Sequence, residues 1–166
     1  DASVLLYLGW TPETFYVAGI VTDDEQVARF HESQIYRDDC LEVFWDLDRD
    51  GFRFDGNPRD VQIGLAPSGK PETTWELWAW GALNQRPDDV QVAVRQQGRR
   101  ALFELGIPLK HLPGVAVDGP VRFSVAYHDR DADGKEAKLH WSVDTASIPG
   151  AILFGQMTLS GHEAAP

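Results

Sequence analysis

Hydrophobic and polar residues alternate along most of the chain, in short stretches separated by clusters of Gly, Pro, Asn and Asp. Alternation with a period of two is typical of β-strands that bury one face, and the intervening clusters favour turns. About ten stretches have this pattern, and they are SVLLYLGW, TFYVAGIVTD, CLEVFWDLD, DVQIGLAP, TTWELWAW, VQVAVRQQ, RALFELGIP, VRFSVAYHD, KLHWSV and ILFGQMTLS. Helical character extends over no more than a turn, near Glu25–Glu32 and Pro108–Leu112. We therefore predict an all-β fold, an antiparallel β-sandwich with jelly-roll-like or immunoglobulin-like layers.

The alternation also assigns side chains to the two faces of each strand. In CLEVFWD the apolar set that should face the core is Leu41, Val43 and Trp45. The other set, which should face outward, is Glu42, Phe44 and Asp46. The stretch VRFSVAYHD divides in the same way, and its outward set is Arg122, Ser124, Ala126 and His128. We expect both strands to be half-buried, with one face in the core and the other in water.

The length of 166 residues suits one domain with a substantial core. We assign residues 1–160 to a single β-sandwich and residues 161–166, GHEAAP, to a tail or linker. The chain begins with Asp1 rather than Met, so we expect a processed protein or a part of a longer one.

Charge and composition narrow the range of partners. Fifteen basic residues against 26 acidic ones give a formal charge of −11, which disfavours nucleic acids and anionic lipid surfaces. No apolar run is long enough to span a membrane, so we expect no membrane insertion. The single cysteine, Cys40, excludes an internal disulfide and is expected to be a small buried residue. Neutral ligands and cations are the partners that this composition favours.

The stretch TTWELWAW contains three of the six Trp residues of the chain. Trp75, Leu77 and Ala79 form its apolar set, which leaves Glu76, Trp78 and Trp80 on the other side. Because Glu76 would be costly to bury without a partner, its face should be in contact with water. Two Trp residues on such a face would form an aromatic platform for a ligand; the alternative is that a loop or a second layer covers this face.

Two acidic loops place carboxylates on alternate residues before a glycine, a spacing that suits Ca²⁺. The candidate ligands are Asp46, Asp48 and Asp50 in the first loop, Asp129, Asp131, Asp133 and Glu136 in the second, and Asp39 upstream. Neither loop is an EF-hand, because the twelfth positions hold Asn57 and His140 instead of Glu. Solvated hairpin turns remain the alternative, since Asp and Gly favour turns for backbone reasons alone.

Motifs of catalysis are absent from the sequence. It contains no nucleophile elbow, phosphate-binding glycine loop or zinc-protease motif, and its five His residues lack ligand spacing. Glu76 paired with Glu42 or Glu104 could in principle serve a glycosidase, but nothing in their spacing selects them. We therefore expect no enzyme, although the chain could accompany one as an accessory module.

The order of several segments resembles the family 9 carbohydrate-binding modules and their DOMON-like relatives. These segments are FYVAGIVTDD, YRDDCLEVFWDLDRDG, RDVQIGLAPSG, ALFELGIPLKHL, VRFSVAYHDRDADGKEAKLHWS and FGQMTL, and they extend over roughly Phe15 to Leu159. The resemblance implies a non-catalytic, extracytoplasmic β-sandwich with structural calcium and a sugar held between Trp rings. The acidic positions of the family match Asp39, Asp46, Asp129 and Asp131, and Trp141 matches a family Trp after the second acidic loop.

The first functional hypothesis is thus a secreted or cell-surface carbohydrate-binding module, stabilised by calcium, that binds a neutral saccharide through Trp stacking. The candidate sugar-binding residues are Trp78, Trp80, Trp75, Trp141, Glu76, Gln62, Asn84, Gln91 and Arg95. One alternative is haem binding, as in some DOMON-like relatives, for which Met157 offers the one thioether; its place in FGQMTL instead favours packing in the core. The other alternative is a structural domain whose Trp faces are covered by neighbouring domains of a longer chain.

Overall fold

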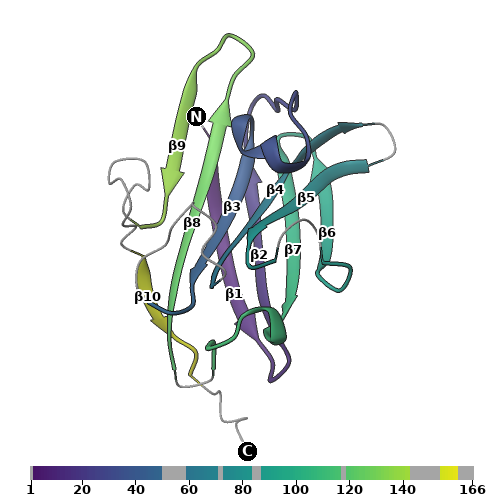
Figure 1. Cartoon of the computed structure of the whole chain (residues 1–166). Helices are drawn as coiled ribbons and strands as arrows, with labels where there is room; N and C mark the ends of the chain where they lie inside the picture. Colours follow the sequence, from purple (N-terminus) through teal and green to yellow (C-terminus); the bar gives the residue numbers. More distant parts are fainter. Residues whose placement is uncertain are drawn as a thin grey trace, which may run out of the picture.

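The computed structural model describes residues 2–49, 59–70, 73–83, 87–116, 119–142 and 154–160. In this part of the chain two antiparallel sheets pack face to face (Figure 1). The four-stranded sheet has the order β1 (Ser3–Trp10), β2 (Thr14–Thr22), β7 (Arg100–Pro108), β6 (Gln91–Gln97). The six-stranded sheet has the order β10 (Gly155–Thr158), β8 (Pro120–Arg130), β3 (Cys40–Asp46), β4 (Asp60–Lys70), β5 (Thr73–Gly81), and β9 (Glu136–His140) also pairs with β8. The predicted antiparallel β-sandwich is confirmed.

The hydrophobic core lies between the two sheets. Three buried rings meet at its centre: the ring of Trp45 on β3 lies 5.8 Å from that of Phe15 on β2 and 5.4 Å from that of Phe123 on β8. Met157 on β10 packs against this core, as its position in the alternation predicts. Cys40 is buried and free, also as predicted.

The outer face of the six-stranded sheet is covered at its centre. Glu42, Phe44 and Asp46 point away from the core, as the alternation predicts, but all seven residues of β3 are buried. Phe44 packs against Phe154, and the neighbouring outward residues Ser124 and Ala126 of β8 are buried too. The prediction that these strands are half-buried is therefore wrong, because a second layer lies over the outer face.

A short 3-10 helix, η1 (Glu32–Arg37), contributes to this layer. The helical turn predicted near Glu25–Glu32 is wrong, because no helix forms over residues 25–31 and η1 begins only at Glu32; η1 packs against β3, β4 and β5. The other predicted turn is confirmed as η2 (Leu109–His111). In the described segments of the chain, no helix combines the length and the apolar character that crossing a membrane requires.

Candidate functional site

Three aromatic side chains gather where η1 meets the six-stranded sheet. Trp78 and Trp80 on β5 are half-buried and pack with Ile35 of η1. The ring of Trp80 lies over Gly64 of β4, where a Cβ atom would come within 2.8 Å of it, and its indole N–H donates to the Ser33 carbonyl at 3.3 Å. Tyr36 packs edge-on against Trp80, with ring centroids 6.2 Å apart, and its side chain is 44% exposed. We call Tyr36, Trp78 and Trp80 the aromatic cluster.

Glu76 on β5 fixes the start of η1. One of its carboxylate oxygens accepts a hydrogen bond from the Glu32 amide at 2.7 Å, and the other lies 3.1 Å from His31 Nδ1. Glu32 has a φ of 55°, a left-handed conformation that is unfavourable for a residue with a side chain. Glu76 therefore holds a strained turn in place, and the face of Trp78 and Trp80 is partly covered by η1 instead of open to water.

A buried polar cluster lies beside the aromatic cluster on the same face. Glu42 of β3 accepts hydrogen bonds through one oxygen from Gln62 Nε2 at 2.6 Å and through the other from His128 Nε2 at 2.5 Å. Glu42 and Gln62 are buried, and His128 is mostly so. Gln62 also pairs directly with Trp80 across β4 and β5. This cluster thus places amide and carboxylate groups next to indole rings.

One residue of each cluster borders a small hollow between η1 and β9. Its volume is about 200 Å³, and its lining combines Tyr36 of the aromatic cluster and His128 of the polar cluster with charged side chains of both signs, which are Arg37, Asp38, Asp129, Arg130, Glu136 and Lys138. An exposed aromatic ring next to buried hydrogen-bonding groups can hold a ligand that has both an apolar face and hydroxyl groups.

The other predicted sugar-binding residues lie elsewhere or outside the description. Trp75 faces the core side of β5, where its N–H reaches Gln96 Oε1 of β6 at 3.4 Å. Trp141, 55% exposed, lies against Gly155 and Phe123 at the edge of the interior between the sheets. Gln91 and Arg95 are on the four-stranded sheet, and Asn84 lies outside the described residues. Of the two glutamate pairs considered for a glycosidase, Glu76 and Glu104 are on different sheets, whereas Glu76 and Glu42 are both on the six-stranded sheet.

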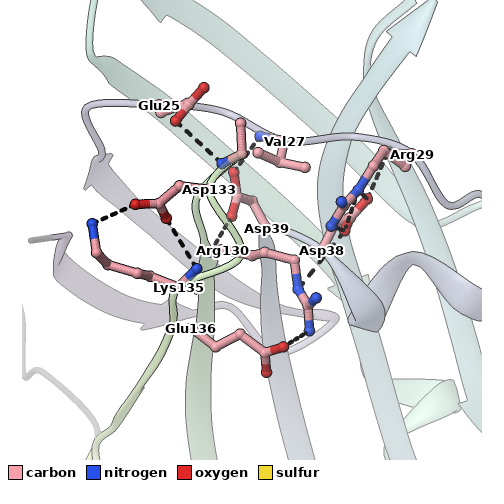
Figure 2. A network of polar contacts seen from close by, with 10 residues as sticks. Glu25, Val27, Arg29, Asp38, Asp39, Arg130, Asp133, Lys135 and Glu136 are labelled. Atoms are coloured by element: carbon pink, nitrogen blue, oxygen red, sulfur yellow. Dashed lines mark hydrogen bonds and ion pairs between the residues drawn. The ribbon is translucent and has the colours of Figure 1, made fainter.

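A first group of carboxylates forms at one end of the six-stranded sheet. Asp23, Asp39 and Asp129 are all buried, and each offers an oxygen within 4.8 Å of the others. Figure 2 shows Asp39 between Val27 and Arg130, whose backbone amides donate to its two oxygens at 2.5 and 2.7 Å. The Tyr127 hydroxyl donates to Asp23 at 2.6 Å.

Burial makes the negative charge of these carboxylates energetically unfavourable. Loss of hydration, together with the neighbouring carboxylates Asp23 and Asp129, raises the pKa of Asp39 to about 7, against the hydrogen bonds of two amides. Burial also raises the pKa of Asp23. Asp38, the residue before Asp39, behaves differently: burial raises its pKa, but hydrogen bonds from Arg29 outweigh this effect and lower it.

A second group of carboxylates, Asp46, Asp48 and Asp60, also brings one oxygen from each residue within 4.8 Å. Asp46 and Asp60 are buried and stand directly opposite each other on β3 and β4, where like charges destabilise a sheet. Arg122 Nη1 approaches Asp46 at 3.3 Å. The first acidic loop of the sequence therefore contributes Asp46 and Asp48 to this group, and Asp50 lies outside the described residues.

Three predicted metal ligands of the second acidic loop do not join either group. The hairpin between β8 and β9 closes with hydrogen bonds from the Asp131 amide to the Lys135 carbonyl and from the Gly134 amide to the Asp131 carbonyl. Asp133 pairs with Lys135, and Glu136 pairs with Arg130 (Figure 2). For these residues the arrangement is that of a solvated hairpin turn.

Both carboxylate groups fit a hard divalent cation. Each supplies three carboxylates, and oxygen is the donor atom that Ca²⁺ takes. A bound cation would offset the mutual repulsion of the carboxylates and the loss of hydration that raises the pKa of Asp39. The structure thus provides two places where the predicted calcium could bind, and each combines two predicted residues with one that the sequence analysis missed.

The raised pKa of Asp39 predicts an unusual pH dependence for the calcium-free protein. A carboxyl whose pKa is about 7 in the folded state and 3.8 when unfolded binds more protons in the folded state, so stability falls as pH rises through this window. The loss is at most about 4 kcal/mol. In EDTA, the melting temperature should be lower at about pH 7.5 than at about pH 5. Asp39→Asn should remove most of this slope, and a wild-type melting temperature that rises through the window would contradict the explanation.

The sequence analysis missed five residues of these sites, which are Tyr36, Asp23, Asp60, Glu42 and His128. Asp23 ends the stretch TFYVAGIVTD and Asp60 begins DVQIGLAP, so acidic residues at strand ends were the available signal. Glu42 and His128 stood in the outward sets of two strands, and their burial depends on a layer that strand alternation does not predict. Glu42 and His128 come together because β3 pairs with β8. His128 stands opposite Cys40, which is two residues from Glu42 and therefore on the same face of the sheet.

Comparisons with known proteins agree with this architecture. The family model described as "Carbohydrate family 9 binding domain-like" matches residues 2–162. A carbohydrate binding module family 9 from Caldicellulosiruptor kristjanssonii, solved in complex with cellotriose, has a TM-score of 0.72 and 16% sequence identity, and the alignment covers 100% of this chain and 80% of that one. Its structure in complex with glucose gives a TM-score of 0.72 at 15% identity with the same coverage. No curated protein matches the chain. Since the family model matches nearly the whole sequence, the chain belongs to the carbohydrate family 9 binding domain-like family.

Proposed function

We propose that this domain is a non-catalytic module that binds an uncharged saccharide on the outer face of the six-stranded sheet. The observation that carries the proposal is the hollow in which Tyr36 of the aromatic cluster and His128 of the buried polar cluster meet. A pyranose has an apolar face that can pack on aromatic rings and hydroxyl groups that need hydrogen-bond partners. The charge of −11 favours a neutral ligand over an acidic one.

The comparisons support the same class of ligand. The family description refers to carbohydrate binding, and the similar module from C. kristjanssonii was solved with cellotriose and with glucose. We infer that soluble β-linked gluco-oligosaccharides are the first ligands to test. The absence of catalytic motifs in the sequence accords with a binding role beside other domains of a longer, extracytoplasmic protein.

Calcium is the second part of the proposal. Asp23, Asp39 and Asp129 would hold one ion, and Asp46, Asp48 and Asp60 would hold another. Bound calcium would neutralise carboxylates that the fold buries together. It would also hold the ends of β3 and β8 in place, because Asp39 precedes β3 and Asp129 lies near the end of β8. Calcium therefore stabilises the sheet on which the saccharide site is built.

The saccharide site is tested by replacing one exposed aromatic residue at a time. Tyr36→Ala removes an aromatic ring that lines the hollow, so the affinity for cellotriose measured by calorimetry should fall by about tenfold. The matched control is Trp141→Ala, which removes an exposed ring on a different face and should leave the affinity within about twofold. Equal losses from the two substitutions, or a loss from Trp141→Ala alone, would place the site elsewhere.

A further inference from the structure

The outer face of the four-stranded sheet has a hollow of its own. Its volume is about 440 Å³, and its lining includes the small side chains of Ala18 on β2 and Ala93 on β6 together with the larger apolar side chains of Ile20 and Leu102. The hollow lies on the face that points away from the core, so it is separated from the candidate site of the six-stranded sheet by the whole thickness of the sandwich. A volume in this range is typical of small-molecule sites.

One row of side chains across this sheet defines the hollow. Tyr7 of β1 stands opposite Ala18, Ala18 stands opposite Glu104 of β7, and Glu104 stands opposite Ala93. Tyr7 and Glu104 are thus two strands apart, about 10 Å, with only a methyl group between them. The gap over Ala18 therefore has an aromatic wall on one side and a carboxylate on the other, with room for one sugar ring.

Further side chains give the hollow the same mixed character. Arg95 of β6 lines it next to Glu104, and no ion pair joins these two residues in the described part of the chain. Tyr16 of β2 stands in the next row of side chains, opposite Gly106 of β7, and its ring packs over this glycine. Gln91 of β6 stands opposite Gly106 on the other side of β7. Tyr7 and Tyr16 are 59% and 41% exposed, so both present ring surface to solvent on this face of the sheet.

The chemistry of the hollow favours an uncharged, hydroxyl-rich ligand over a protein partner. At the centre of protein interfaces charged residues are depleted, whereas here Glu104 and Arg95 line the hollow itself. Their opposite charges leave the hollow without a net charge of its own, and the −11 of the chain disfavours an anionic ligand. The exposed ring of Tyr7 supplies a flat apolar surface beside Ile20 and Leu102, and Glu104 and Arg95 supply an acceptor and donors for hydroxyl groups.

We propose that this hollow is a second saccharide-binding site, with Tyr7 as its stacking residue and Glu104 and Arg95 as its hydrogen-bonding residues. This inference goes beyond the proposed function, because it places a ligand on the opposite sheet and uses none of the same residues. Two sites on opposite faces would let one domain bridge two saccharide chains, and the avidity for a polysaccharide would then exceed the affinity for a trisaccharide.

The experiment is amide chemical-shift mapping by NMR on the full 166-residue chain in calcium, titrated separately with cellotriose, xylotriose and mannotriose. The expected result is a saturable shift of the Ala18 and Ala93 amides with at least one trisaccharide. Tyr7→Ala and Glu104→Gln should each weaken this response by about fivefold, and Tyr7→Phe, which keeps the ring, should retain it. Melting curves of the variants establish that they are folded.

The outcomes separate this inference from the proposed function. Shifts confined to Gly64, Trp80 and their neighbours would overturn the second site and leave the first one standing. Shifts confined to Ala18 and Ala93 would support the second site and overturn the location of the first, and no shift with any of the three sugars would overturn both. Shifts of Ala18 that depend on protein concentration without sugar would identify a second copy of the chain as the occupant and would overturn the saccharide site.

Discussion

Removing calcium is expected to lower the melting temperature of the domain by about 5–10 °C for each ion, or about 10–20 °C in all. A site that is saturated at about a hundred times its dissociation constant contributes about 2.7 kcal/mol to the free energy of unfolding. For a chain of 166 residues, this corresponds to a shift of several degrees for each ion. The physical reason is that the three carboxylates of each group, of which all but Asp48 are buried, repel one another, and a divalent cation offsets this repulsion.

Single substitutions separate the two ions from the hairpin turn. Asp129→Asn should remove about half of the difference between the melting temperatures in calcium and in EDTA, and Asp60→Asn the other half. Asp133→Asn is the matched control, because Asp133 pairs with Lys135 in the hairpin and not with either carboxylate group. If the wild-type protein melts at the same temperature in calcium and in EDTA, neither group is a structural metal site.

Glu42→Ala is expected to lower the free energy of unfolding by about 3–5 kcal/mol. The substitution removes a carboxylate that accepts hydrogen bonds from Gln62 and His128, and it leaves these two groups buried without their acceptor. The saccharide affinity should fall as well, because His128 and Gln62 lose the group that orients them beside the aromatic cluster. Urea unfolding measures the first effect, and calorimetry in native buffer measures the second.

Two variants make this prediction specific. Glu42→Gln keeps the shape and an acceptor oxygen, so it should cost far less than Glu42→Ala. Glu104→Ala removes a glutamate from an exposed position on the other sheet and should change stability by no more than about 0.5 kcal/mol. A loss from Glu42→Ala as small as that from Glu104→Ala would mean that the buried polar cluster contributes nothing to the fold.

Alternation and turn chemistry are sufficient to predict the strands of this fold. The stretch CLEVFWD became β3 with Leu41, Val43 and Trp45 in the core, as its pattern predicts. What alternation cannot predict is whether the other face of a strand is covered. The burial of Glu42 depends on the partners Gln62 and His128, which are 20 and 86 residues away in the sequence.

The candidate sites were predictable to the extent that they depend on local spacing. Asp46 with Asp48 and Asp39 with Asp129 entered the carboxylate groups, but Asp131 and Asp133 did not, since a hairpin uses them for its own turn. Which acidic residues converge is decided by strand pairing: Asp60 joins the second group because β4 pairs with β3 and places it opposite Asp46.

The Trp residues illustrate the same limit. The spacing in TTWELWAW correctly separates Trp75 from Trp78 and Trp80, because Trp75 faces the core side. It does not predict that η1 covers Trp80 and adds Tyr36 to the cluster. The platform of two open Trp rings is therefore replaced by a partly covered cluster whose exposed ring is Tyr36.

The central claim is that the domain binds an uncharged saccharide. The most direct test is calorimetric titration of the unmodified protein with cellotriose and glucose, followed by a panel of neutral oligosaccharides. The titrations are run in calcium and repeated in EDTA. A saturable heat with at least one neutral sugar, weakened in EDTA, is the predicted result. The absence of binding to every sugar of the panel by a protein that is folded and loaded with calcium would contradict the claim.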